Sequence, residues 1–396
     1  MESSHEGVLQ AAAGNHRAPA SSRTPDQLVS TSDLFAEADL DLTSLASGSG
    51  ETPVGIDRHL PPTPNPSTPN DMQVIVFPGA GAPDLLMESN CARDSDTSTR
   101  ATKTIKRLHE LGATRSLKSP APNWHEELNG LQKNFPNFSQ VITTIIGPHL
   151  ALMDSGIKHK MPAVLLIGPP GIGKTQVALN LAALMCVPSL FLPMNSETNS
   201  SARAGSSTFW SNSNPGRLFE LLAWGTKGES PVANPLIILD EADKVTADRY
   251  DPLAALYSLL EEETASKFED QSLPDIVFDA SNVRYILTAN DASTIPEPIL
   301  SRVIQFHIPM PTQLEQREIT QSIFRGLIEK LVLEFDNRLC DEILADATQL
   351  GPRTCKVRLN TAIGISFASG HKRLEIDSWV KSDVGRTPRT TRMGFT

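Results

Sequence analysis

The sequence has little of what marks several specialised classes of protein. Its four cysteines, Cys91, Cys186, Cys340 and Cys355, include no CxxC pair, which argues against a disulfide framework or a zinc site. No run reaches the ~18 apolar residues that a membrane-spanning helix needs, and the amino terminus lacks the basic-then-apolar order of a signal peptide. We therefore expect a soluble protein of the cytoplasm, with reduced thiols and no membrane partner.

Positive charge and aromatic residues are also scarce. The chain has 396 residues and a net charge of −11 at pH 7, which makes nucleic acid an unexpected partner, because proteins that coat phosphate backbones are basic. Aromatic residues make up 5% of the sequence whereas prolines number 30, which is typical of a chain that is only partly packed into globular domains. The length is still sufficient for a sizeable core.

The beginning and the end of the chain have the composition of unfolded segments. The amino-terminal part is rich in Ser, Thr, Pro and Gly, with runs such as ASGSGETP and LPPTPNPSTPN. Such segments cannot bury enough apolar surface to offset their ordering entropy, so we expect residues 1–120 to form a disordered leader. This leader is either a plain linker or a recruitment tail. The basic stretch from Thr102 is interpreted as a solvated helix, and residues 381–396 as a flexible tail.

Strand-like and helix-like segments alternate from about Trp124 onward. Short apolar runs typical of buried strands are separated by helical patterns and occur at residues 163–168, 190–193, 236–240 and 283–290. The alternation predicts an α/β domain over residues 121–310, in which helices cover both faces of a mostly parallel sheet.

The pattern becomes purely helical after Pro311. Thr312 and Glu315 have the spacing of a capping box, in which each side chain bonds a backbone N–H at the start of a helix. We therefore expect a small helical domain over residues 311–380.

A glycine-rich motif follows the first apolar run. It matches the pattern G-x-x-x-x-G-K-[ST] and consists of Gly168, Pro169, Pro170, Gly171, Ile172, Gly173, Lys174 and Thr175. Glycines let backbone N–H groups curl around phosphates, and the helix that follows presents its positive end to them. Lys174 would neutralise the β- and γ-phosphates, and the Thr175 hydroxyl would ligate Mg²⁺. The position between a strand and a helix favours an ATP and Mg²⁺ site over a chance turn.

A later apolar run ends in two carboxylates, Asp240 and Glu241. Asp240 would hold Mg²⁺ through water, and Glu241 would act as the base that polarises the attacking water. Alone, such a pair could equally be an acidic helix cap. Together with the phosphate-binding loop it indicates nucleotide hydrolysis.

The letters DEAD at residues 240–243 also raise the possibility of a DEAD-box RNA helicase. That family has Ser-Ala-Thr on its next motif strand and a second α/β domain. Here the next strand ends in Thr288-Ala289-Asn290, and a helical domain follows. The helicase interpretation fails on both counts.

Residues 134–362 resemble the AAA+ module of Lon-type ATPases. Besides the two phosphate motifs, the resemblance rests on the run DPLAALYSLLE from Asp251, on IVFD from Ile276, and on three segments that contain Asn290, Arg302 and Arg353. It implies a P-loop NTPase fold followed by a small helical lid domain.

The resemblance also assigns roles to three polar residues. Asn290 matches the sensor-1 position, where an amide can hold the attacking water without adding charge. Arg302 matches the arginine finger, which reaches into a neighbouring subunit's site, so a ring of copies of this chain, a hexamer, is implied. Arg353 matches the sensor-2 position, which couples lid closure to the γ-phosphate.

One further segment bears on the partner. In Lon-like proteins an aromatic residue five positions before a Pro-Gly-Arg grips extended polypeptide in the pore of the ring. The same count places Trp210, with Phe209 beside it, in a possible pore loop. The family's tyrosine is absent, and a Phe-Trp pair folded back onto the domain is the open alternative.

Lon proteins continue from the lid into a peptidase domain, whereas only about 40 residues follow Arg353, fewer than a domain of ordinary size. We therefore expect an ATP-hydrolysing motor that remodels or unfolds a protein partner without intrinsic proteolysis. Two alternatives stay open. One is a clamp-loader-like ATPase that acts on DNA, because Leu300-Ser301-Arg302 is also similar to that group. The other is a nucleotide-dependent switch with negligible turnover.

Overall fold

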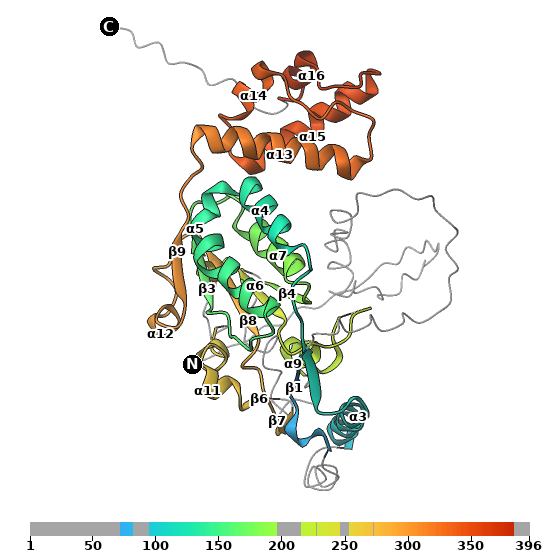
Figure 1. The fold of residues 1–396 in the computed structure, drawn as a ribbon, viewed down its shortest axis with the longest axis vertical. Coiled ribbons are helices and arrows are strands. Elements are labelled where there is room, and N and C mark those ends of the chain that lie inside the picture. Colours follow the sequence, from blue (N-terminus) through green and yellow to red (C-terminus); the bar gives the residue numbers. More distant parts are fainter. Residues whose placement is uncertain are drawn as a thin grey trace, which may run out of the picture. The chain divides into compact units, whose positions relative to one another are not determined.

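The computed structural model describes most of the chain after residue 71, in the ranges 72–81, 95–195, 215–226, 228–245, 253–271 and 273–383 (Figure 1). Most of the expected leader, residues 1–71, and the expected tail from residue 384 lie outside these ranges. So does the segment 196–214, which contains Phe209 and Trp210. Within the described ranges, no helix combines the length and the apolar character that crossing a membrane would require.

A five-stranded parallel sheet forms the centre of the fold, with the strand order β4-β5-β8-β3-β9. Its strands are β3 (Val164–Ile167), β4 (Ser189–Pro193), β5 (Leu236–Asp240), β8 (Arg284–Ala289) and β9 (Ile304–His307). Every side chain of β3 and β8 is buried, as expected for strands covered on both faces. The predicted α/β fold is confirmed, and the four apolar runs form β3, β4, β5 and β8. The edge strand β9 was not among them, because most of its side chains are exposed.

One face of the sheet is covered by the helices on either side of the phosphate-binding loop (Figure 1). These elements are α4 (Trp124–Asn134), η3 (Pro136–Phe138), α5 (Ser139–Val141), the π-helical turn η4 (Ile142–Ile146), α6 (Gly147–Asp154) and α7 (Lys174–Leu184). They pack on alternate strand side chains, among them Val164, Leu166 and Ile238. This period of two is what the pleat of a buried strand requires.

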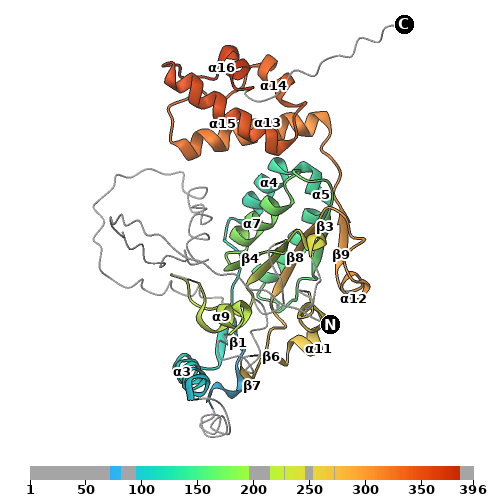
Figure 2. The same ribbon diagram turned by 180° about the vertical axis from the view of Figure 1, so that it is seen from behind.

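The opposite face is covered by shorter elements (Figure 2). They are α9 (Arg217–Trp224), η5 (Ala242–Lys244), α10 (Leu256–Leu259), α11 (Glu262–Ala265), the antiparallel pair β6 (Phe268–Asp270) and β7 (Leu273–Phe278), and α12 (Glu297–Leu300). The second core cluster contains the strand residues that point away from the first, such as Leu165 and Leu239.

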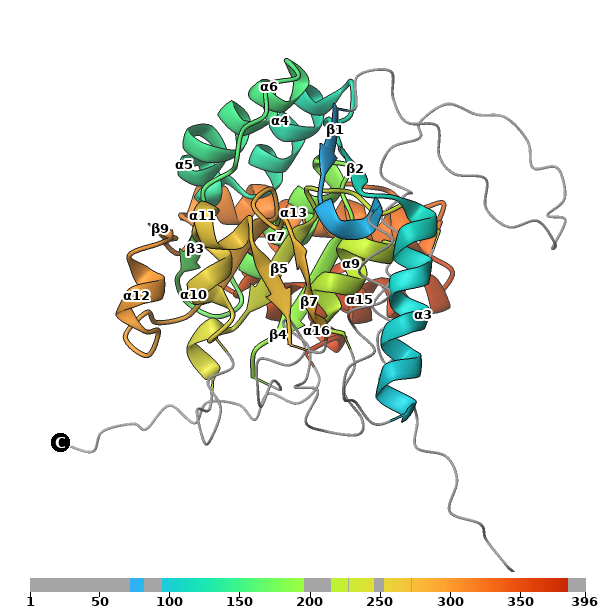
Figure 3. The same cartoon turned by 90° about the horizontal axis from the view of Figure 1, so that it is seen from below.

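The expectation that residues 1–120 are disordered is wrong for their last part. This part forms β1 (Met72–Ile75), η2 (Pro78–Gly81), α3 (Ser95–Leu111) and β2 (Thr114–Leu117). Val76 and Phe77 are fully buried, and the Phe77 ring lies 5.7 Å from that of Phe219 and 5.6 Å from that of Phe278. The basic stretch is helical as predicted. Figure 3 shows this helix, α3, and its Arg107 lies 4.2 Å from the ring centroid of Trp224, the last residue of α9.

The prediction of disorder from composition failed for this segment because a few apolar side chains in a polar segment are enough to complete a core.

After the sheet the chain is helical, as predicted. The helices are α13 (Gln313–Leu331), α14 (Asp341–Ala347), α15 (Pro352–Ala368) and α16 (Ile376–Lys381). They enclose a core of their own, which includes Phe324, Leu359 and Trp379. The predicted capping box is present: the Thr312 N–H donates to Glu315 Oε2 (2.7 Å), and the Glu315 N–H donates to Thr312 Oγ1 (3.3 Å). The domain boundary at residue 310 stays a prediction.

Candidate nucleotide-binding site

The glycine-rich loop connects the end of β3 to the start of α7, and its glycines are sterically required. A Cβ atom at Gly168 would lie 2.5 Å from the carbonyl oxygen of Ile308. Gly171 and Gly173 have φ angles of +82° and +104°, which side chains other than glycine rarely adopt. The loop can therefore turn its backbone N–H groups toward one point at the amino end of α7, as phosphate binding requires.

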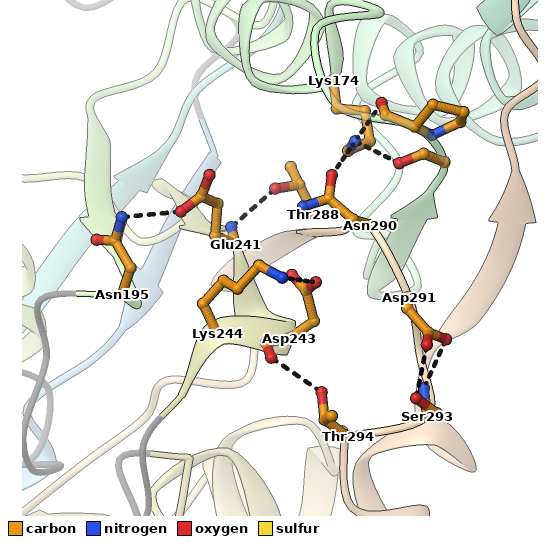
Figure 4. Close-up of polar contacts among 12 residues, drawn as sticks. Lys174, Asn195, Glu241, Asp243, Lys244, Thr288, Asn290, Asp291, Ser293 and Thr294 are labelled. Carbon is orange, nitrogen blue, oxygen red and sulfur yellow. Dashed lines mark hydrogen bonds and ion pairs between the residues drawn. The ribbon is translucent and has the colours of Figure 1, made fainter.

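Lys174 lies across this loop. Its Nζ donates to the carbonyl oxygens of Gly168 (2.7 Å) and Pro169 (2.9 Å) and to Oδ1 of Asn290 (3.0 Å) (Figure 4). Burial lowers the pKa of Lys174, and nearby carboxylates, Asp240 first, oppose that shift. The structure thus joins the phosphate-binding lysine to the sensor-1 asparagine, two residues that the sequence assigned separately.

The carboxylate of Asp240, at the end of β5, links the helix α7 to the strand β8. Its Oδ1 accepts hydrogen bonds from the hydroxyls of Thr175 (2.7 Å) and Thr288 (2.6 Å). Carboxylate and hydroxyl oxygens are the hard ligands that Mg²⁺ prefers, so Thr175 and Asp240 fit the metal role predicted for them. The sequence analysis assigned no role to Thr288. The available signal was a hydroxyl near the end of a mostly apolar strand.

Glu241 has an unusual backbone conformation, with φ +56° and ψ +46° in the left-handed region. This costs a residue with a side chain about 1–2 kcal/mol. Its N–H donates to Thr288 Oγ1 (3.0 Å), and its Oε2 accepts a hydrogen bond from Asn195 Nδ2 (2.8 Å) (Figure 4). Asn195 follows β4, the strand next to β5, and the sequence analysis missed it. Because parallel strands end at the same edge, a polar residue two positions after β4 was the signal.

Arg302 is not brought to the phosphate-binding loop. Its Nε forms an ion pair with Glu261 Oε1 (2.6 Å), and its guanidinium also donates to the carbonyl oxygen of Pro298. Among the described contacts, none links Arg302 to the predicted nucleotide-binding residues. This is compatible with the predicted role, in which the residue serves a neighbouring copy.

Arg353 is the second residue of α15, and its side chain is exposed. A Cβ atom built on Gly171 would lie 3.6 Å from Arg353 Cβ. The amino end of the lid helix therefore lies against the phosphate-binding loop. The sensor-2 role stays a prediction.

Comparison with known proteins agrees with this geometry. Residues 164–311 match the sequence model of the family described as ATPase family associated with various cellular activities (AAA). These residues form an AAA ATPase domain.

The curated relatives are similar to about half of the chain. The Lon protease of Metamycoplasma arthritidis is 33% identical over 190 residues, which are 47% of this chain and 22% of that protein. The Lon protease of Clostridium beijerinckii is 34% identical over 244 residues, which are 59% of this chain and 30% of that protein. The chain thus spans well under half the length of these relatives. The predicted resemblance to the Lon ATPase module is confirmed.

Among solved structures, a RuvB mutant from Thermotoga maritima is similar over 63% of this chain and 69% of its own chain. The identity is 15% and the TM-score is 0.42.

The contacts of Thr288 generate a prediction about metal binding. Thr288→Val keeps the shape of the side chain but removes the donor to Asp240 and the acceptor for the Glu241 N–H. We expect the Mg²⁺ dependence of ATP hydrolysis to shift to roughly 10–100-fold higher concentration, as for other groups that orient metal ligands. Thr288→Ser, which retains the hydroxyl, should resemble the wild type. An unchanged Mg²⁺ titration curve for Thr288→Val would refute the role of Thr288.

Proposed function

We propose that this chain is an ATP-driven motor that assembles with copies of itself and remodels a protein partner. The observation that carries the proposal is the set of contacts joining Lys174 to Asn290, and Asp240 to Thr175 and Thr288. A cation, a hydroxyl, a carboxylate and an amide are thereby held around one loop. This is the donor set needed to bind a triphosphate and to position water against it.

The residues of this site have distinct tasks in hydrolysis. Lys174 would exchange its loop carbonyl partners for phosphate oxygens, and Thr175 and Asp240 would hold Mg²⁺ directly or through water. The metal supplies positive charge that neutralises the phosphates. Glu241 accepts the proton of the attacking water once its carboxylate is free of Asn195. The Asn290 amide orients that water without adding charge.

In the proposed assembly, Arg302 of a second copy of the chain supplies the remaining positive charge at the γ-phosphate. The Arg302 side chain is 28% exposed, and that of Glu261 is 47% exposed. An ion pair of this kind contributes only about 0–1 kcal/mol, so a neighbour's γ-phosphate can replace Glu261 as the partner of Arg302. In GTPases such an arginine accelerates hydrolysis by about 10³–10⁵-fold.

Complementation between two inactive variants tests the shared site. Arg302→Ala removes the finger that serves the neighbour, and Glu241→Gln removes the base of the subunit's own site, so each alone should hydrolyse ATP poorly. A 1:1 mixture should regain up to about a quarter of the wild-type rate, because random assembly pairs an intact Glu241 with an intact Arg302 at that share of interfaces. An inactive mixture, or a monomeric enzyme with full activity, would contradict the assembly.

A polypeptide is the proposed partner because of the segment that precedes α9. Residues 215–217 are the Pro-Gly-Arg that follows the predicted pore loop, and the Gly216 N–H donates to Asp270 Oδ2 (2.7 Å). The fully buried Asp270 belongs to β6, so one end of that loop is fixed to the core. An aromatic side chain on an anchored loop can press against an extended chain whatever its sequence. The acidic net charge of −11 disfavours the DNA alternative.

Trp210→Ala tests the choice of partner. We expect it to retain ATP hydrolysis but to lose ATP-dependent unfolding of a protein substrate, with Phe209→Ala as the milder matched control. If Trp210 is instead packed into the domain, its loss should destabilise the fold by about 3–5 kcal/mol and reduce ATPase activity together with the melting temperature. ATPase activity that is stimulated by primed DNA but not by unfolded protein would favour the clamp-loader alternative.

A further inference from the structure

Arg284 is the first residue of β8, and its guanidinium is buried. The amino end of β8 lies away from the phosphate-binding loop, which faces the carboxyl ends of the strands. Its residue exposure is 3%, and one terminal nitrogen donates to the carbonyl oxygen of Asn234 (2.7 Å). The other terminal nitrogen contacts Met153 Sδ (3.2 Å), and Nε has no hydrogen-bond partner among the described residues. A thioether is a weak acceptor, so a group with five N–H donors has one good acceptor here.

In a second buried arginine of this fold, the guanidinium donors are paired with hydrogen-bond acceptors. Arg115, also 3% exposed, donates hydrogen bonds of 2.7–3.3 Å to four backbone carbonyl oxygens, those of Gly112, Thr114, Leu222 and Ala223. Its donors are used to hold β2 against α9. Arg284 is buried to the same extent without such a set of acceptors, which is costly for a charged group.

The surroundings of Arg284 are electropositive. Burial lowers its pKa to about 9, so the guanidinium is still charged at pH 7, and no carboxylate of the described ranges opposes the shift. Within the part of the chain that the structure describes, neither ring nitrogen of the buried His149 has a hydrogen-bond partner. Its pKa is lowered to about 3 by burial, then by the charge of Arg284, then by His159. An additional proton is disfavoured here, whereas an anion would be stabilised.

A cavity of about 30 Å³ borders Arg284. Lys118, Lys158, His159 and Asn282 also line it, and none of the lining residues that the structure describes is Asp or Glu. Lys158 and His159 are exposed, so the cavity adjoins the surface. Because one water molecule needs roughly 10–15 Å³ of such space, about two oxygen-sized groups fit.

We propose that this cavity binds a small oxyanion, a phosphate or carboxylate group, with the Arg284 guanidinium as its principal contact. Two anionic oxygens match the space, and each terminal nitrogen of Arg284 has one N–H beyond those directed at Asn234 and Met153. Guanidinium groups bind such pairs of oxygens readily. Asn282 and Lys158, which also line the cavity, supply further donors. The site is separate from the ATP site: it lies at the amino ends of β5 and β8, whose carboxyl ends carry Asp240 and Asn290.

Thermal unfolding of the full chain with sodium phosphate, sodium succinate or sodium chloride at equal ionic strength tests the proposal. The Lys174→Ala background removes phosphate binding at the ATP site. At an oxyanion concentration ten times its Kd, the melting temperature should rise by about 3 °C above its value in chloride. Comparison of phosphate with succinate shows which oxyanion is preferred. No rise with either, or an equal rise with chloride, would overturn the proposal.

Arg284→Met in the same background should abolish the rise, and it is expected to fold because an apolar side chain of similar volume replaces an unpaired buried charge. Arg115→Lys is the matched control: it should lower the melting temperature in chloride yet keep the rise. Lys158→Gln, at an exposed position, should weaken binding severalfold and serves as the test if Arg284→Met does not fold. A full oxyanion response in Arg284→Met or an unchanged affinity in Lys158→Gln would refute the site.

Discussion

One carboxylate oxygen, Oδ1 of Asp240, accepts hydrogen bonds from two hydroxyl groups, and these two bonds organise the nucleotide site. One donor, Thr175, lies on the first turn of α7, and the other, Thr288, lies near the end of β8. Three segments that are far apart in the sequence are thereby fixed at one edge of the sheet. A parallel sheet makes this possible, because all of its strands end at the same edge, and charge-assisted hydrogen bonds such as these two are strong.

The remaining polar groups depend on this arrangement. With β5 and β8 in register, the Thr288 hydroxyl also receives the N–H of Glu241 and supports its left-handed backbone. Asn290, two residues further along, then meets Lys174. The Glu241 carboxylate is held by Asn195, and Arg302 by Glu261, so the proposed base and the proposed finger both have partners that must be exchanged for substrate. In the proposed function, such a site is set for hydrolysis and is completed by ATP and a neighbouring copy.

Sequence patterns predicted those parts of the site that are local. The glycine-rich loop and the carboxylates after β5 are contiguous motifs, and the positions of Asn290 and Arg353 followed from a family resemblance. Asn195 and Thr288 were missed because their roles depend on which strands are neighbours in the sheet. The pairing of Arg302 with Glu261 likewise joins separate segments. The boundary of the leader was placed too late because average composition hides a short apolar run such as the one containing Phe77.

Phosphate release and ATP binding, measured on the wild type and on Lys174→Ala and Glu241→Gln variants, test the central claim most directly. The wild type should bind and hydrolyse Mg-ATP, and Lys174→Ala should bind it poorly. Glu241→Gln should bind ATP with wild-type affinity but release phosphate about 10²–10⁴-fold more slowly, because only the base is lost. Wild-type turnover no faster than that of Glu241→Gln would contradict the motor and leave a nucleotide-dependent switch.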